Sequence, residues 1–130
     1  LAFLFMMCFV GMPTIFYGDE LGVQGIREEE YRAPMPWKGG DMALSGFFRK
    51  AIAMRHALSP LRDGTFQMLS AEEGSRVIRF RRDTGAASVM VCINAGNTAT
   101  AIPQSGETLY WAEGLQNGIL SPGGFSVTYR

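Results

Sequence analysis

Two adjacent carboxylates, Asp19 and Glu20, are the first residues of this chain that could carry out acid–base chemistry. They lie in the stretch GMPTIFYGDELG, where an apolar run passes through a proline and meets the two acids between glycines. Neighbouring residues of a strand point to opposite faces, whereas cleavage of a glycosidic bond needs two carboxyl groups roughly 5 to 9.5 Å apart across a sugar. We therefore interpret Asp19 and Glu20 as scaffold at the end of a strand, not as a catalytic pair.

A second candidate is Arg32, in the stretch YRAPMPW. The two prolines stiffen this loop, and we expect Met35 and Trp37 to anchor it against the core. An arginine on a stiff loop can make a fixed, two-pronged contact with a carboxylate or contact sugar hydroxyls directly. The alternative is a surface arginine paired with one of the glutamates at 28–30, and the residues alone leave both readings open.

Other reactive side chains do not complete a catalytic set. Trp37 could stack on a sugar ring, although a tryptophan beside proline and methionine is more often core. His56 is the only histidine, and we expect it on the surface or partly buried on a helix. Cys8 and Cys92 lie in apolar runs without nearby metal-ligating residues, so packing is favoured over zinc binding, and a disulfide between them stays open. We predict no catalytic residue, no metal site and no cofactor.

The composition is that of one modest globular domain. The chain has 130 residues, of which 47% are hydrophobic and 18% charged, and its twelve basic side chains balance twelve acidic ones. This balance predicts neither a nucleic-acid partner nor an anionic membrane surface. Four arginines, at 76, 79, 81 and 82, fall in one predicted strand, and we expect them to form a solvated face.

The elements of the first half explain where the candidates sit. Residues 1–10 carry no charge and no amphipathic period, so we expect a segment buried all round, a helix by preference, closed by Gly11. At ten residues this run is too short to cross a bilayer, which needs roughly twenty. Residues 14–17 read as a strand that a parallel sheet would bury. Residues 21–40 then form a long loop, and long loops in compact domains suggest function.

A helix is predicted at 42–58, capped by Asp41 and stopped by Pro60. From Thr65 onward, short runs of strand formers alternate with turns at 73–74, 83–85 and 94–97 and indicate an antiparallel sandwich or barrel. The predicted strands are 65–69, 76–82, 87–93, 108–112 and 125–130. Because the buried strand at 14–17 has no neighbours in this chain, we expect the first half to be part of a larger domain.

These stretches resemble a known family. GMPTIFYGDELG followed by YRAPMPW is similar to the last barrel strand and the following loop of the α-amylase family, glycoside hydrolase family 13. The likeness continues to AIAMRHALSPLRDG and RVIRFRRDTGAASVMVCINAGN, and it leans toward the neopullulanase, cyclomaltodextrinase and oligosaccharide-hydrolase branch. It implies an α/β plus all-β fold: the last βα unit of a (β/α)8 TIM barrel over residues 1–62, then a C-terminal antiparallel β-sandwich domain over 63–130.

The resemblance also implies a function. Members of the family act on α-glucans with retention through a covalent intermediate. Their two aspartates and one glutamate lie on earlier barrel strands, so all three would precede Leu1. The chain is thus expected to be a C-terminal fragment of a retaining hydrolase or transglycosylase (EC 3.2.1.-) for α-1,4 bonds, with α-1,6 bonds open, and to be inactive alone. Arg32 matches an arginine at the floor of the glucose pocket, and Glu20 and Trp37 match positions that support it.

The implied partner is a maltooligosaccharide or α-glucan, bound through the full-length enzyme, and the expected location is the cytoplasm. One alternative is a non-catalytic carbohydrate-binding sandwich, in which Tyr110 or Trp111 stacks on a sugar; packing on the barrel without a ligand is favoured over it. A membrane-anchored β protein using residues 1–17 is the least favoured reading. We also expect the isolated chain to be poorly soluble, because residues 1–10 and 14–17 would expose apolar surface.

Overall fold

Helices come first and strands follow in the computed structural model, which describes residues 1–71, 74, 76–103 and 106–130. The helices are α1 (Ala2–Cys8), a 3-10 helix (Asp19–Leu21), α2 (Glu28–Tyr31), α3 (Met42–Ala57) and α4 (Ser59–Asp63). The strands are β1 (Thr65–Ala71), β2 (Val77–Asp83), β3 (Ser88–Asn94), β4 (Thr100–Ala101), β5 (Thr108–Gln116) and β6 (Ile119–Tyr129).

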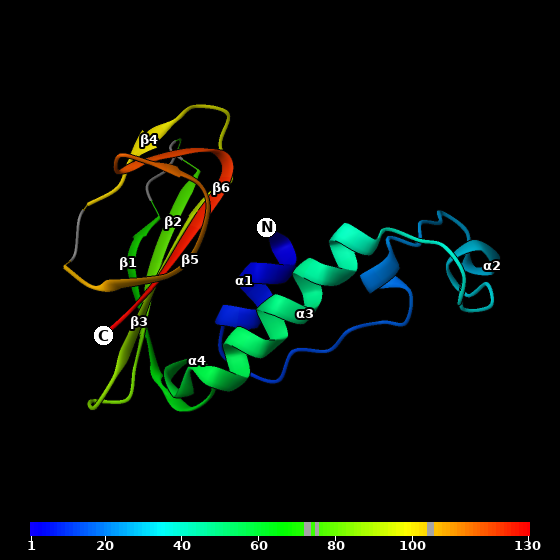
Figure 1. The fold of residues 1–130 in the computed structure, drawn as a ribbon, viewed down its shortest axis with the longest axis horizontal. Helices are drawn as coiled ribbons and strands as arrows, with labels where there is room; N and C mark the ends of the chain where they lie inside the picture. The colour runs from blue at the N-terminus through cyan, green and yellow to red at the C-terminus, as the bar shows by residue number, and fades with distance from the viewer. Residues whose placement is uncertain (72–73, 75, 104–105) are drawn as a thin grey trace.

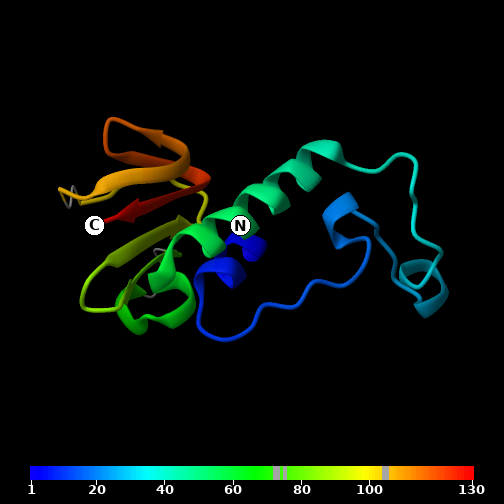
Figure 2. The same ribbon diagram turned by 60° about the horizontal axis from the view of Figure 1, so that its bottom comes forward.

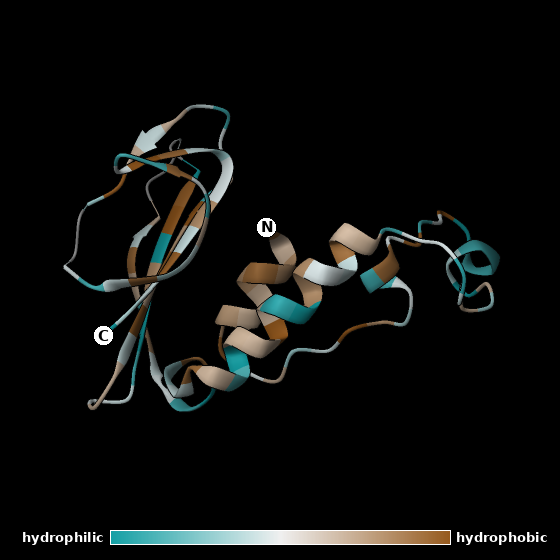
Figure 3. Ribbon diagram, in the orientation of Figure 1, coloured by the Kyte–Doolittle hydropathy of each residue, from teal (hydrophilic) through white to brown (hydrophobic). Residues whose placement is uncertain are grey.

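The chain is elongated, with the sheet at one end and the segment that carries α2 at the other (Figure 1). Helices α1, α3 and α4 lie between them, and a second view shows α3 running from the sheet toward the distal segment (Figure 2). Coloured by hydropathy, α1 is apolar whereas α2 is strongly hydrophilic (Figure 3). The helical middle therefore links the sheet to a distal segment whose helix α2 is much more hydrophilic than α1.

Among the described residues the strands form one antiparallel sheet in the order β1-β2-β3-β6-β4, and β5 also pairs with β6. Strand β6 causes the sheet to curl, because its start pairs with β4 and the end of β5 while its later part pairs with β3. Two register shifts in the β5–β6 ladder add the extra twist that bulges produce. The antiparallel topology is confirmed, but one curled sheet replaces the two separate layers of the predicted sandwich.

The main core lies between this sheet and the helices. A cross-strand row of four buried side chains (Phe80, Val91, Val127 and Trp111) runs over β2, β3, β6 and β5. Leu4, Met7, Met54 and Leu61 pack against the same side from α1, α3 and α4. A smaller cluster on the opposite side combines Val77, Cys92 and Leu120. Strand β3 is buried along its whole length, because it is covered on both faces.

Two predictions for the first seventeen residues are wrong. The strand at 14–17 does not form: residues 14–16 have no regular secondary structure, and they pair with none of the strands in the described part of the chain. Residues 1–10 do contain a helix, but α1 is buried on one side only, where it meets the sheet and α3. The helix also ends before Gly11: its last residue is Cys8, and the capping residue Phe9 has an extended backbone.

The predicted helix at 42–58 is confirmed as α3. Asp41 caps it as expected, since its Oδ1 accepts a hydrogen bond of 2.9 Å from the backbone N–H of Leu44. The role given to Pro60 is wrong, because α3 ends at Ala57 and Pro60 lies in the first turn of α4. A proline is tolerated there because the first turn of a helix has no intrahelical partner for its N–H.

Several features of the sheet were missed. Strand β4 was not predicted, and β5 and β6 extend into a hairpin across Asn117 and Gly118, both with positive φ. The Asn-Gly pair is the usual sequence signal for such a turn. The predicted turn at 94–97 is confirmed at its start, where the side-chain Oδ1 of Asn94 accepts a hydrogen bond from the N–H of Gly96. The turn at 73–74 is only partly described, since Glu73 lies outside the described residues.

Candidate functional site

An open groove of about 640 Å³ lies between the segment 15–39 and helix α3. Its walls combine aromatic, aliphatic and charged side chains, among them Tyr17, Glu20, Trp37, Ser45, Arg49 and Ile52. Such a mixture of apolar surface and a few polar groups is typical of small-molecule sites. Two of the three predicted site residues, Glu20 and Trp37, thus line one groove, whereas Arg32 is not part of its lining.

Glu20 is held by the turn that it helps to form. Its Oε2 accepts a hydrogen bond of 2.9 Å from the N–H of Gly18, and the Oδ2 of Asp19 accepts one of 3.2 Å from Phe16. Gly18 has φ +92, and an added Cβ would come within 2.9 Å of the Val23 side chain, so the turn requires glycine. Both carboxylates therefore stabilise backbone N–H groups of this turn, as a scaffold role requires.

Arg32 lies away from the groove, on the surface. Its guanidinium is 2.7 Å from Oε1 of Glu28, and the two side chains are 64% and 59% exposed. Of the two readings left open, this geometry matches the pairing with a neighbouring glutamate. Nearby, Oε2 of Glu30 accepts from the N–H groups of Ile26 and Arg27, and these hydrogen bonds hold the pKa of Glu30 below its usual value.

The expectation that Trp37 is a core residue is wrong. Its side chain is 87% exposed, whereas Met35 in the same loop is half-buried and lines the groove. The loop places Trp37 at the rim because its backbone N–H bonds to Met35 two residues before, in a tight local turn. An exposed indole at the rim of a groove can stack on a flat apolar face of a ligand.

The alternative that Trp111 binds a sugar is also wrong. Trp111 is 5% exposed and packs against Phe47 and Phe125, while Nζ of Lys50 lies 4.3 Å from its ring centroid. Tyr110, on the opposite side of β5, is 44% exposed. Of the two aromatic side chains in this strand, only Tyr110 is thus accessible to a ligand.

The arginines of β2 do not form one solvated face, and the prediction fails at Arg82. This residue is 1% exposed and donates to the carbonyls of Cys8, Leu61 and Gly64 at 3.1, 3.0 and 2.8 Å. Burial, with the nearby Arg55 charge, lowers the pKa of Arg82. The signal was available, because Arg82 lies two residues after Phe80 and period-two alternation puts both on the core side.

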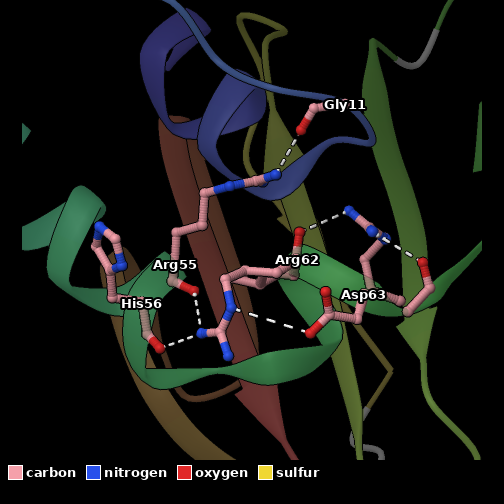
Figure 4. Close-up of polar contacts among 8 residues, drawn as sticks. Gly11, Arg55, His56, Arg62 and Asp63 are labelled. Atoms are coloured by element: carbon pink, nitrogen blue, oxygen red, sulfur yellow. Dashed lines mark hydrogen bonds and ion pairs between the residues drawn. The ribbon is translucent and has the colours of Figure 1, made fainter.

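Arg55, on α3, is a second residue that sequence reasoning passed over. Its Nη1 donates to Met7 at 2.7 Å and Phe9 at 3.0 Å, and its Nη2 donates to Gly11 at 2.6 Å. Figure 4 shows this side chain reaching Gly11 while Arg62 turns to the carbonyls of Arg55 and His56. Arg55 and Arg82 together satisfy carbonyls at the C-terminal end of α1, where cations are favourable.

Both cysteines are free and buried, so the packing interpretation is confirmed and the two do not form a disulfide. Burial raises the pKa of Cys8 to about 12 and that of Cys92 to about 11.

His56 is exposed on α3, as expected. Within the described residues no three histidine, cysteine or acidic side chains come together as metal ligands. The helices in that part of the chain are also too short or too polar to span a bilayer.

No protein-family model matches the chain, but individual relatives do. Cyclomaltodextrinase from Bacillus sp is 34% identical over 120 residues, which are 91% of this chain and 20% of the relative. Neopullulanase 2 from Thermoactinomyces vulgaris is 34% identical over 112 residues, 82% of this chain and 19% of the relative. The chain thus spans about a fifth of the length of these curated relatives.

Solved structures show the same fold. The maltogenic amylase from S. marinus superposes with a TM-score of 0.82 over 98% of this chain and 18% of its own, at 22% identity. At this identity the likeness is one of fold, and it covers both the helices and the curled sheet. Taken with the GMPTIFYGDELG and YRAPMPW stretches, the relatives show that this chain belongs to the α-amylase family, glycoside hydrolase family 13.

Proposed function

We propose that this chain is the C-terminal portion of a retaining α-glucan hydrolase or transglycosylase and that it contributes one wall of the substrate site. The observation that carries the proposal is the groove that both Glu20 and Trp37 line. Support comes from the relatives, whose names, cyclomaltodextrinase and neopullulanase, state cyclic maltodextrins and pullulan as their substrates. The proposed bond is α-1,4, with α-1,6 as the alternative.

In this proposal residues 1–62 belong to the barrel and residues 63–130 form the C-terminal β domain. The catalytic carboxylates come from barrel strands outside this chain, and the enzyme works in the cytoplasm. Glu20 shapes the groove through its bond to the Gly18 N–H, and Trp37 supplies a stacking surface. Arg32 would reach the substrate pocket only by leaving Glu28, and their exposed ion pair is of a kind that contributes little to stability.

The groove is tested by titrating the chain with maltotriose and following tryptophan fluorescence. Trp37→Ala should abolish the fluorescence response, and the affinity measured by titration calorimetry should fall about tenfold, since stacking of an aromatic ring is worth about 1.4 kcal/mol. Tyr110→Ala is the matched control, because it removes an exposed aromatic side chain outside the groove. The reverse pattern, with Tyr110 needed and Trp37 dispensable, would support the carbohydrate-binding sheet instead.

The absence of catalysis is tested on the same preparation. Purified chain incubated with maltooligosaccharides should release no reducing ends above the rate of buffer. Measurable hydrolysis that disappears in Glu20→Gln would show that the acidic residues of this chain are catalytic, and it would overturn the assignment of Glu20 as scaffold.

A further inference from the structure

Helix α3 forms one wall of the groove and also holds the segment that forms the other. Ser45, Phe48, Arg49 and Ile52 face the groove at helical spacing. Arg55 follows Ile52 by three residues and therefore extends the same stripe by one turn toward α1. From there it bonds to the carbonyls of Met7, Phe9 and Gly11, so one helix fixes both walls.

The segment between α1 and the 3-10 helix packs against the main core through the partly buried Ile15. Residues 12–16 have no regular secondary structure, and Met12 is 91% exposed. At the distal end the carbonyl of Leu21 accepts a hydrogen bond of 2.9 Å from the N–H of Asp41, the cap of α3. Within the turn, Asp19 and Glu20 accept from the N–H groups of Phe16 and Gly18. At the proximal end the bond from Arg55 to Gly11, 2.6 Å long, is the last polar anchor before the segment leaves α1.

We propose that Arg55 is a positioning residue for the groove: by holding the Gly11 carbonyl it sets where residues 12–22, and with them Glu20, lie relative to α3. This inference rests on the proposed function of the groove. A planar guanidinium suits the task, because its donors serve three carbonyls at once in a fixed geometry, whereas the ammonium of lysine is a flexible point charge. Gly11 itself has φ +97, so the chain turns at the anchored residue.

The test compares Arg55→Lys and Arg55→Met with Arg62→Lys in the 130-residue chain. Arg62 is a matched control, because it donates to the carbonyls of Arg55 and His56 and, within the described part of the chain, makes no hydrogen bond to residues 7–11. Backbone order parameters of residues 12–22 are measured by NMR, together with those of β3 as a reference. Affinity for maltotriose is measured in parallel.

We expect the order parameters of residues 18–22 to fall below about 0.6 in both Arg55 variants while β3 stays near 0.85, and Arg62→Lys to leave both unchanged. Maltotriose affinity should fall about tenfold in the Arg55 variants only. Unchanged order parameters in Arg55→Lys overturn the positioning role, whether or not sugar binds. If Arg55→Met fails to fold, Arg55→Lys decides alone.

A different pattern separates the two proposals. Loss of order in residues 18–22 in a chain that never binds maltotriose would sustain the positioning role and defeat the proposed function of the groove. Equal loss of order in β3 and in residues 18–22 would show that Arg55 acts only on global stability, and the positioning role would then be wrong.

Discussion

Arginine serves opposite purposes in two regions of this molecule. Arg82 is buried where the sheet meets α1 and α4, and it donates to three backbone carbonyls. Arg32, in the distal segment, is 64% exposed and pairs with a single, equally exposed glutamate. In the first region water is excluded, so each lost hydrogen bond leaves a buried carbonyl unpaired. In the second region, water can hydrogen-bond to a group whose partner has been removed.

The same contrast holds for the aromatic side chains. Phe80 is completely buried in the cross-strand row, whereas Trp37 is 87% exposed at the rim of the groove. The region around the sheet is thus built for stability, whereas the segment 12–40 leaves most of its side chains exposed. Variants made in pairs, one from each region, measure how sharp this division is.

The largest effect is expected for Phe80→Ala. Deleting a fully buried aromatic ring should lower the free energy of unfolding by about 4 kcal/mol, because it removes apolar burial and leaves a cavity. Trp37→Ala should change it by less than about 0.5 kcal/mol, since the exposed indole gains little from folding. Urea denaturation of both variants checks this. Similar losses for the two would mean that Trp37 packs in solution and that the division between the regions fails.

Arg82→Met should cost about 3 kcal/mol, because it leaves the carbonyls of Cys8, Leu61 and Gly64 buried without a donor. Arg79→Met is the control, since Arg79 is only half-buried on the other side of β2. The midpoints and slopes of urea unfolding give both values. A loss below 1 kcal/mol for Arg82→Met would show that water reaches these carbonyls.

The pH dependence of stability sharpens the view of the packed region. Burial raises the pKa of the Cys8 thiol from 9.0 to about 12. As the pH rises above 9, the unfolded chain therefore loses the thiol proton while the folded chain keeps it, and the free energy of unfolding declines. From pH 9 upward the decline should be steeper than in Cys8→Ala by up to about 1.4 kcal/mol per pH unit. Urea unfolding at pH 8 and pH 10 measures it. Parallel curves for the two proteins would contradict the buried thiol.

The smallest effect is expected for Arg32→Gln. An exposed ion pair four residues apart on a helix contributes about 0.3 to 0.5 kcal/mol, and salt screens it. Thermal melting at low and high salt should show a difference from the unchanged protein that nearly vanishes at 0.5 M NaCl. A larger loss of thermal stability that does not depend on salt would show that Arg32 makes a buried contact, as Arg82 does.

Local patterns predicted much of this fold. Runs of strand formers between turn residues placed β2 and β3, and helical spacing and Asp41 placed α3. The GMPTIFYGDELG and YRAPMPW stretches pointed to the family that the relatives show. These features depend on residues close together in the chain. The hydrogen bond from the Gly18 N–H to Glu20 is equally local, because it joins residues two positions apart.

Other features depend on which element covers which side chain, and only the tertiary structure decided them. Trp37 is exposed and Trp111 buried, although both are tryptophans in apolar surroundings, because α3 covers β5 and nothing in the described residues covers the loop at 35–40 to the same extent. Residues 14–17 have the composition of a strand, but a strand needs a neighbouring backbone, and composition cannot supply one. Arg82 turned inward because α1 and α4 end with free carbonyls beside it.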